Sequence, residues 1–201
     1  MLDAYLRPVI DIPLARAGRA LARRGVHPDA VSFVGLGLGI AAAAALAIRL
    51  DWVALLLLLA NRLCDGLDGA VARNVGGSDL GGFYDIVFDF LFYSGMVFGF
   101  ALGRPDHALA ASFLIFSFVG TGASFLAFAI VAAKRGLATE VRGKKAFFHV
   151  GGLTEGTETI LVLAAICLFP MAFDWIAFGF GTLCWLTTAG RIVAAQRAFG
   201  S

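Results

Sequence analysis

The chain has 201 residues, of which 60% are hydrophobic and 15% are charged, and its mean hydropathy is +0.86. This composition excludes an ordinary soluble domain and is typical of an integral membrane protein. The formal net charge of +2 comes from 16 basic and 14 acidic residues, a balance that predicts no nucleic-acid partner. The three cysteines lack the spacing of a zinc site or of a disulfide framework.

An amphipathic segment precedes the first long apolar run. Residues 1–26 place apolar side chains at helical spacing and five arginines mostly off that stripe, a pattern typical of a helix lying on anionic headgroups. Pro8 and Pro13 argue against a single straight helix. We therefore predict a cytoplasmic interfacial segment over residues 1–26 and a transmembrane domain over residues 27–201.

Six apolar runs follow, and a membrane crossing needs roughly 20 residues. Their approximate bounds are 31–50, 52–73, 82–103, 108–133, 155–170 and 173–194. The second and third runs carry charged residues at membrane depth, the fourth carries none, and the fifth is a few residues short. The predicted fold is all-α and integral to the membrane, with six transmembrane helices and an N-terminal amphipathic interfacial helix.

Basic residues are unevenly divided between the two ends of these predicted helices. Thirteen lie at one end, Arg49 and Arg104 lie at the other, and Arg62 lies within the second run. Because basic residues mark cytoplasmic loops, the end with thirteen is predicted to face the cytoplasm. Both termini belong to that end.

Four aspartates lie near the cytoplasmic ends of the second and third runs. Asp65 and Asp68 are three residues apart, and Asp85 and Asp89 are four apart, so each pair shares one helix face. Antiparallel helices bring the four carboxylates to the same depth in the membrane. Placing each charged side chain at that depth costs at least about 2.5–3.5 kcal/mol. Compensation comes from neighbouring arginines, from hard divalent cations or from protonation. A purely structural ion-pair network is the other interpretation, but four acids against two arginines leave it unbalanced.

Small residues surround these acids. Gly69 and Ala72 leave the acidic face of the second run almost bare, and four glycines between residues 76 and 82 expose the backbone of the following turn. Backbone amides in such a turn, Arg73 and one or two divalent ions together predict a surface that binds a pyrophosphate group.

The complete pattern resembles a family signature. Asp65-x-x-Asp68-Gly69-x-x-Ala72-Arg73, then seven residues, then Gly81-x-x-x-Asp85-x-x-x-Asp89, resembles the signature of the CDP-alcohol phosphotransferase (CDP-alcohol phosphatidyltransferase class I) family at all eight fixed positions. Pro28-Asp29-x-x-Ser32 is similar to the family's Pro-Asn-x-x-Thr start of the first helix. Residues 151–159 resemble a bacterial inner-membrane branch of the family, which implies an inner (plasma) membrane location but no particular acceptor.

The resemblance implies an enzyme that transfers substituted phosphate groups. It would move a phosphatidyl group from CDP-diacylglycerol to the hydroxyl of an alcohol and release CMP. The resemblance implies that Mg²⁺ or Mn²⁺, with two ions expected, is bound by Asp65, Asp68, Asp85 and Asp89, and that Asp89 is also the general base. The CDP moiety of the donor would lie against Gly69, Ala72, Arg73 and Gly81. Membrane lipids would surround the chain, and the resemblance also implies a homodimer.

The acceptor alcohol is left open. Candidate headgroup contacts are charged residues of the long polar loop and of the fifth and sixth runs: Lys144, Lys145, Glu155, Glu158 and Arg191. The basic residues favour a phosphorylated acceptor such as glycerol 3-phosphate or inositol phosphate, whereas the acids suit a cationic or polyhydroxyl acceptor. Membrane topology and helix capping also explain the same residues.

Other functions also remain open at this point. A soluble donor such as CDP-choline or CDP-ethanolamine would transfer its headgroup to diacylglycerol. Acids inside a membrane also line the paths of divalent-cation transporters, although here they gather at one end instead of continuing across. A scaffold without catalysis would have no need of the metal-binding spacing.

Overall fold

The structure is a computed structural model that describes residues 3–136, 154 and 156–200, and these residues contain helices and no β-strand. The long helices are α1 (Asp3–Arg23), α2 (Pro28–Ala47), α3 (Asp51–Val75), α4 (Asp79–Gly103), α5 (Ala108–Lys134), α6 (Gly156–Leu168) and α7 (Phe173–Phe199). Short 3₁₀ turns, Pro105–His107 and Pro170–Ala172, precede α5 and α7. Each of the six predicted apolar runs coincides with one of the helices α2 to α7.

Local sequence signals set the helix ends around the acidic residues. The Ser78 hydroxyl accepts a hydrogen bond from the Gly81 amide at 2.9 Å and so caps the start of α4. Gly76, just after α3, has φ of 95°, a conformation that glycine adopts without strain. Gly76 therefore ends α3 and the Ser78 cap begins α4, and together they define the turn between the two helices.

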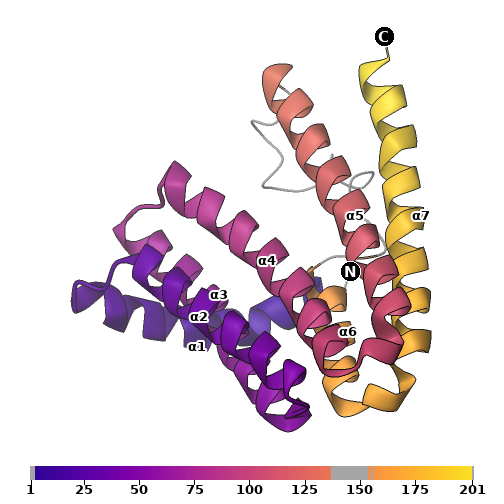
Figure 1. The fold of residues 1–201 in the computed structure, drawn as a ribbon. Helices are drawn as coiled ribbons and strands as arrows, with labels where there is room; N and C mark the ends of the chain where they lie inside the picture. Colours follow the sequence, from indigo (N-terminus) through magenta and orange to yellow (C-terminus); the bar gives the residue numbers. More distant parts are fainter. Residues whose placement is uncertain (1–2, 137–153, 155, 201) are drawn as a thin grey trace.

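The helices form two groups that α4 joins (Figure 1). In the first group α2 packs against both α3 and α4, and α1 lies along α3. In the second group α5 packs against α7, while the short α6 contacts α3, α4 and α7. A Cβ added at Gly99 of α4 would collide with the Ala43 carbonyl of α2, so the glycine permits the close approach of these two helices. The core between the groups includes the stacked rings of Phe100 and Phe173, whose centroids are 4.0 Å apart.

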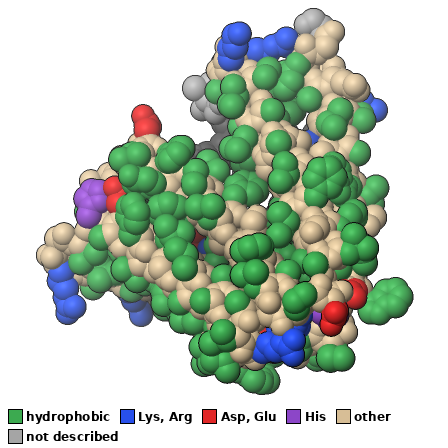
Figure 2. Space-filling model, viewed as in Figure 1, with side chains coloured by type: hydrophobic (Ala, Val, Ile, Leu, Met, Phe, Trp, Pro, Cys, Tyr) green, Lys and Arg blue, Asp and Glu red, His purple; other side chains and the backbone are tan. Residues whose placement is uncertain are grey.

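Four helical segments are long and apolar enough to cross a membrane: Pro28–Ala47, Asp79–Gly103, Pro105–Lys134 and Pro170–Phe199. Helix α3 is long but carries several charges, and α6 has 13 residues, which span only about 20 Å. Large apolar side chains lie on the outside, including Trp52, Met171 and Trp175, and green side chains are spread over the face shown in Figure 2. A surface of this kind faces lipid in a membrane protein.

Helix α1 is continuous from Asp3 to Arg23, with Pro8 and Pro13 inside it. The two prolines therefore do not divide the segment into separate helices, and the expectation that this helix is not straight stays a prediction. A proline removes one backbone donor and bends a helix without ending it when neighbouring packing holds the chain. Here Gly18 is buried against Ala70 of α3, where an added Cβ would lie 2.7 Å from the Ala70 Cβ.

A separate polar cluster lies at the end of α4 that is remote from the aspartate motif. The Arg104 guanidinium pairs with Asp51 at 2.6 Å and stacks over Phe100 at 4.5 Å from the ring centroid. Nearby, His107 Nδ1 lies 2.7 Å from Asp174 Oδ1. These pairs tie the start of α3 to the end of α4, and the start of α5 to that of α7.

Candidate functional site

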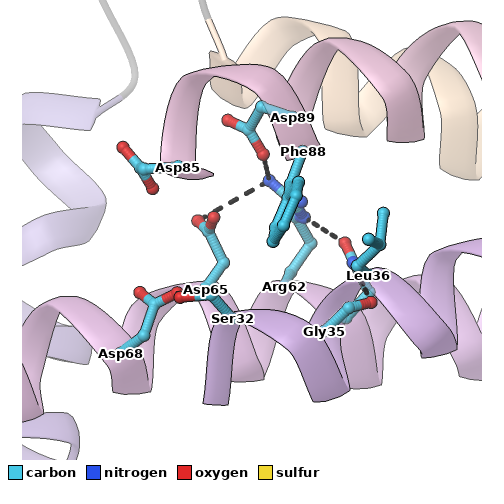
Figure 3. Close-up of a pocket in the computed structure, with 10 residues that line it drawn as sticks. Ser32, Gly35, Leu36, Arg62, Asp65, Asp68, Asp85, Phe88 and Asp89 are labelled. Carbon is cyan, nitrogen blue, oxygen red and sulfur yellow. Dashed lines mark hydrogen bonds and ion pairs between the residues drawn. The ribbon is translucent and has the colours of Figure 1, made fainter. Parts of the chain in front are cut away.

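The four aspartates face one cavity. Helix α3 contributes Asp65 and Asp68, and α4 contributes Asp85 and Asp89, while α2 closes the floor between them (Figure 3). The open cavity has a volume of about 270 Å³ and is lined by Ser32, Gly35, Leu36, Asn61, Arg62, Asp65, Asp68, Asp85, Phe88 and Asp89. The prediction that the two helices bring the four carboxylates together is confirmed.

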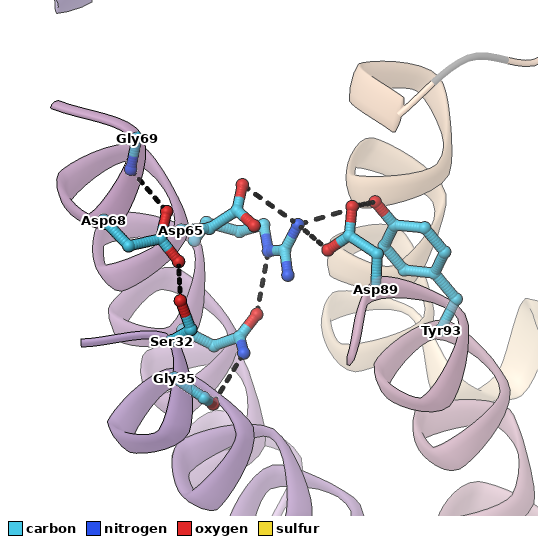
Figure 4. A network of polar contacts seen from close by, with 9 residues as sticks. Ser32, Gly35, Asp65, Asp68, Gly69, Asp89 and Tyr93 are labelled. Carbon is cyan, nitrogen blue, oxygen red and sulfur yellow. Dashed lines mark hydrogen bonds and ion pairs between the residues drawn. The ribbon is translucent and has the colours of Figure 1, made fainter. Parts of the chain in front are cut away.

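One arginine lies among the acids. Arg62 Nη1 is 2.9 Å from Asp89 Oδ1 and 3.6 Å from Asp65 Oδ2, and only 13% of the Arg62 side chain is exposed. The Tyr93 hydroxyl donates to Asp89 Oδ2 at 2.9 Å, so both oxygens of that carboxylate have a partner (Figure 4). Arg62 thus supplies the positive charge at the centre of the acidic group.

The other carboxylates differ in what they contact. Asp68 accepts from the Ser32 hydroxyl and from the Gly69 amide, each at 2.6 Å, which ties α2 to α3 (Figure 4). Asp85 makes no hydrogen bond or ion pair within the described parts of the chain and points into the space between α3 and α4 (Figure 3). Carboxylate oxygens in such a position remain open to a ligand.

A larger cavity adjoins the acidic one. Its volume is about 580 Å³, and it shares Ser32, Asp65, Asp68 and Asp85 with the smaller cavity. The remaining wall consists mostly of small residues: Pro28, Asp29, Gly69, Ala72, Gly77, Ser78, Gly81 and Gly82. Carboxylates along one side and bare backbone along the other suit a ligand that carries both a diphosphate and a flat ring.

Three of the four residues predicted to hold the donor line this cavity, namely Gly69, Ala72 and Gly81. The fourth, Arg73, is exposed, and its Nη1 lies 3.6 Å from where a Cβ on Gly69 would stand. Its guanidinium therefore lies beside the cavity, within reach of its rim.

The residues predicted to bind the acceptor are only partly described. Lys144, Lys145 and Glu155 lie outside the described residues. Glu158 is in the first turn of α6 and is partly buried. Arg191 of α7 is 8% exposed, donates to the Thr121 carbonyl of α5 at 2.8 Å and stacks 5.5 Å from the Phe125 ring centroid. Their roles stay predictions.

Metal ligation is also a prediction. Within residues 3–136, 154 and 156–200, no three acidic, histidine or cysteine side chains converge closely enough to hold an ion as they stand. The donor set is nevertheless chemically suitable, because carboxylates and a serine hydroxyl facing one cavity are hard oxygen ligands of the kind that Mg²⁺ and Mn²⁺ select.

Sequence analysis did not identify Asn61 and Tyr93 as part of the site. Asn61 Nδ2 donates to the Gly35 carbonyl at 2.7 Å, and Asn61 Oδ1 accepts from Arg62 Nε at 2.8 Å. The available signal was helical spacing: Asn61 precedes Asp65 by four residues, and Tyr93 follows Asp89 by four.

Known proteins resemble this chain in sequence and in fold. The profile of the family described as CDP-alcohol phosphatidyltransferase matches residues 25–193. Inner membrane protein YnjF of Escherichia coli is 49% identical over 193 residues, which cover 96% of this chain and 94% of that protein. Archaetidylinositol phosphate synthase of Pyrococcus horikoshii is 34% identical over 99 residues, 49% of this chain and 53% of that protein.

Among solved structures, the phosphatidylinositol phosphate synthase PgsA1 of Mycobacterium tuberculosis, determined with CDP-DAG bound, has the same fold. Its TM-score is 0.68 at 22% sequence identity, over 91% of this chain and 93% of that chain. The apolar helices and the match to an inner membrane protein support a multi-pass membrane protein. The match over residues 25–193, which contain every residue of the acidic cavity, assigns this chain to the CDP-alcohol phosphatidyltransferase family, a family of transferases.

Proposed function

We propose that the chain transfers a phosphatidyl group from CDP-diacylglycerol to the hydroxyl of an alcohol and releases CMP. The observation that carries the proposal is the shared wall of the two cavities, where Asp65, Asp68 and Asp85 face both the acidic group and the small-residue surface. The bound CDP-DAG in the solved relative PgsA1 supports the choice of donor.

The proposed donor position follows from shape and charge. The cytidine and diphosphate lie in the larger cavity against Gly69, Ala72 and Gly81, where no long side chain blocks the backbone. Arg73 at the rim pairs with a phosphate oxygen. The acyl chains remain with the lipid, because the outer surfaces of the neighbouring helices are apolar.

The carboxylates of Asp65, Asp68 and Asp85, with Asp89 as a fourth candidate, would hold Mg²⁺ or Mn²⁺ in this proposal. A bound ion would supply positive charge that offsets the charge of the diphosphate and of the CMP leaving group. An alcohol is a weak nucleophile at neutral pH, so Asp89 accepts the proton of the acceptor hydroxyl. Asp89 suits this role because it stands at the far side of the acidic cavity from Asp68, leaving space between them.

The proposal includes the membrane arrangement. Helices α2 to α7 are the six crossings, α1 is an amphipathic helix on the cytoplasmic surface, and both termini and the site are cytoplasmic. Support comes from Arg16, Arg19 and Arg23 of α1 and from Arg24 just after it, because α1 lies along α3. Helix α6 reaches across only with local thinning of the bilayer, since its 13 residues are short. A homodimer is also part of the proposal.

The test is CMP release by purified protein in lipid with CDP-diacylglycerol, with and without Mg²⁺ or Mn²⁺. Glycerol 3-phosphate, inositol phosphate, inositol, serine, glycerol and choline are supplied in turn as acceptors. We expect metal-dependent CMP release with one acceptor. If only CDP-choline or CDP-ethanolamine with diacylglycerol releases CMP, the donor assignment is wrong. No release under any condition from folded protein contradicts the enzyme.

A further inference from the structure

The guanidinium of Arg62 occupies the space between two carboxylates that the family signature treats as metal ligands. Its Nη1 lies 2.9 Å from Asp89 and 3.6 Å from Asp65, on the side of the cavity away from Asp68 (Figures 3 and 4). A divalent ion that bridged Asp65 and Asp89 would share both carboxylates with this fixed positive charge. Coulomb repulsion between the ion and the guanidinium opposes that arrangement.

Arg62 is held by contacts that do not depend on the acids. Its Nε donates to Asn61 Oδ1 at 2.8 Å, and Asn61 in turn donates to the Gly35 carbonyl of α2 at 2.7 Å. The guanidinium also lies over two rings, with its Cζ 4.7 Å from the Phe92 centroid and 5.6 Å from that of Tyr93. The backbone of α2 and the aromatic face of α4 therefore fix the position of the charge.

The partners of Asp89 and Asp68 are chemically different. Asp68 accepts from a neutral hydroxyl and a neutral amide, Ser32 and Gly69. Each bond uses one lone pair and leaves another on the same oxygen, so Asp68 remains able to bind a cation. Asp89 is paired with a cation through one oxygen and with the Tyr93 hydroxyl through the other. Asp89 thus has the closest contact with the cation, at 2.9 Å, whereas Asp65 lies at 3.6 Å from the same nitrogen and Asp68 bonds only neutral groups.

We propose that Arg62 is a positioning residue that keeps Asp89 out of the metal-binding set. The divalent ion is bound by Asp65, Asp68 and Asp85, while Arg62 and Tyr93 hold the Asp89 carboxylate, free of metal, as the base for the acceptor hydroxyl. The inference rests on the proposed function for the role of Asp89. Its metal-binding part does not depend on any donor or acceptor.

The experiment is titration of Mn²⁺ into purified protein in lipid nanodiscs without substrates, followed by calorimetry and by the spin-resonance signal of free Mn²⁺. The decisive variant is the double change Asp89→Asn with Arg62→Met, which removes one negative and one positive charge together. It leaves neither partner buried and unpaired, so it folds even if a single variant does not. We expect its Mn²⁺ affinity to stay within about threefold of wild type, whereas Asp65→Asn and Asp85→Asn each weaken binding by about tenfold or more.

An affinity loss in the double variant as large as that in Asp65→Asn would overturn the proposal, because it would make Asp89 a ligand. The single change Arg62→Met releases Asp89, and we expect it to bind Mn²⁺ more tightly than wild type or to bind an additional ion. Weaker binding in Arg62→Met would also count against the proposal. Arg104→Met is the matched control, since it removes another buried, ring-stacked arginine paired with an aspartate, and it should leave Mn²⁺ binding unchanged.

Turnover provides an independent readout. We expect Arg62→Met to lower kcat by about tenfold or more while the KM for the donor changes little, because the base and not the donor cavity is disturbed. Arg62→Lys keeps the charge and should recover part of kcat. A rise in donor KM with unchanged kcat would instead assign Arg62 to donor binding. If the Mn²⁺ affinities are as expected but neither wild type nor any variant releases CMP, the proposed function is wrong. The assignment of Asp65, Asp68 and Asp85, and not Asp89, as metal ligands would then still stand.

Discussion

Two buried arginine–aspartate pairs, one toward each end of α4, have nearly the same geometry and different surroundings. Arg62 pairs with Asp89 at 2.9 Å and Arg104 pairs with Asp51 at 2.6 Å, and the exposed fractions of the two arginine side chains are 13% and 14%. Each arginine also stacks on a phenylalanine of α4, at 4.7 Å for Arg62 and 4.5 Å for Arg104. Distance, burial and stacking therefore do not distinguish them.

The balance of charge does distinguish them. At the Arg104 end one aspartate faces one arginine, whereas at the Arg62 end four aspartates face that single buried arginine. A balanced pair compensates itself, but surplus carboxylates that lie close together repel one another and favour the binding of a cation from outside the chain. The acidic end also opens onto cavities of about 270 and 580 Å³. A surplus of like charge beside open space therefore marks the functional end of the molecule better than a buried ion pair does.

The largest effect is expected for Asp89→Asn at the unbalanced end. Loss of a general base lowers turnover by about 10²- to 10⁴-fold. The measurement is the rate of CMP release at saturating donor and acceptor. Asp79→Asn is the control, because it removes the same charge from the exposed first turn of the same helix and should leave the rate unchanged. A rate for Asp89→Asn within a few-fold of wild type would remove Asp89 from the chemistry.

Breaking the balanced pair should affect stability and leave the chemistry intact. Arg104→Met leaves Asp51 buried without its partner and should lower the free energy of unfolding by about 3 kcal/mol. Adding Asp51→Leu removes the stranded charge and should restore most of that loss. Thermal unfolding in detergent measures both variants. Reduced CMP release by folded Arg104→Met protein would mean that the two ends are coupled, contrary to the division drawn between them.

The small-residue wall can be tested by filling it. Gly69→Leu places a side chain in the cavity proposed for the donor and should raise the KM for CDP-diacylglycerol by about tenfold, equivalent to about 1.4 kcal/mol, with a smaller effect on kcat. Gly37→Leu on α2 is the control, since an added Cβ there meets nothing within 4 Å. Equal effects of the two changes would indicate general helix disturbance and not a blocked cavity.

Helical periodicity predicted the helices and predicted that the four aspartates lie close together. Two carboxylates that are three or four residues apart on a helix lie on the same helix face. The small wall around Gly69, Ala72 and Gly81 was likewise predictable from the motif. The partner of Asp89 was not. Sequence spacing left both Arg62 and Arg73 as possible counter-charges, and the choice depends on side-chain packing: Arg62 is stacked within the bundle, whereas Arg73 points outward at the rim. The sequence also did not show that α1 continues through both of its prolines, and this helix lies along α3.

The smallest effect is expected for the second pair at the balanced end, His107 with Asp174. Their separation is 2.7 Å, but 49% of the Asp174 side chain is exposed, and exposed pairs contribute only about 0–1 kcal/mol. Asp174→Asn should therefore lower the free energy of unfolding by no more than that. Where His107 is protonated, the difference should shrink in 1 M salt, because the screening length there is about 3 Å. Paired unfolding measurements at low and high salt test this. CMP release should not change, because the pair joins the starts of α5 and α7 and contributes nothing to either cavity. A substantial fall in CMP release would show that a balanced, exposed pair also contributes to catalysis. A surplus of acidic residues would then no longer distinguish the functional end of the molecule.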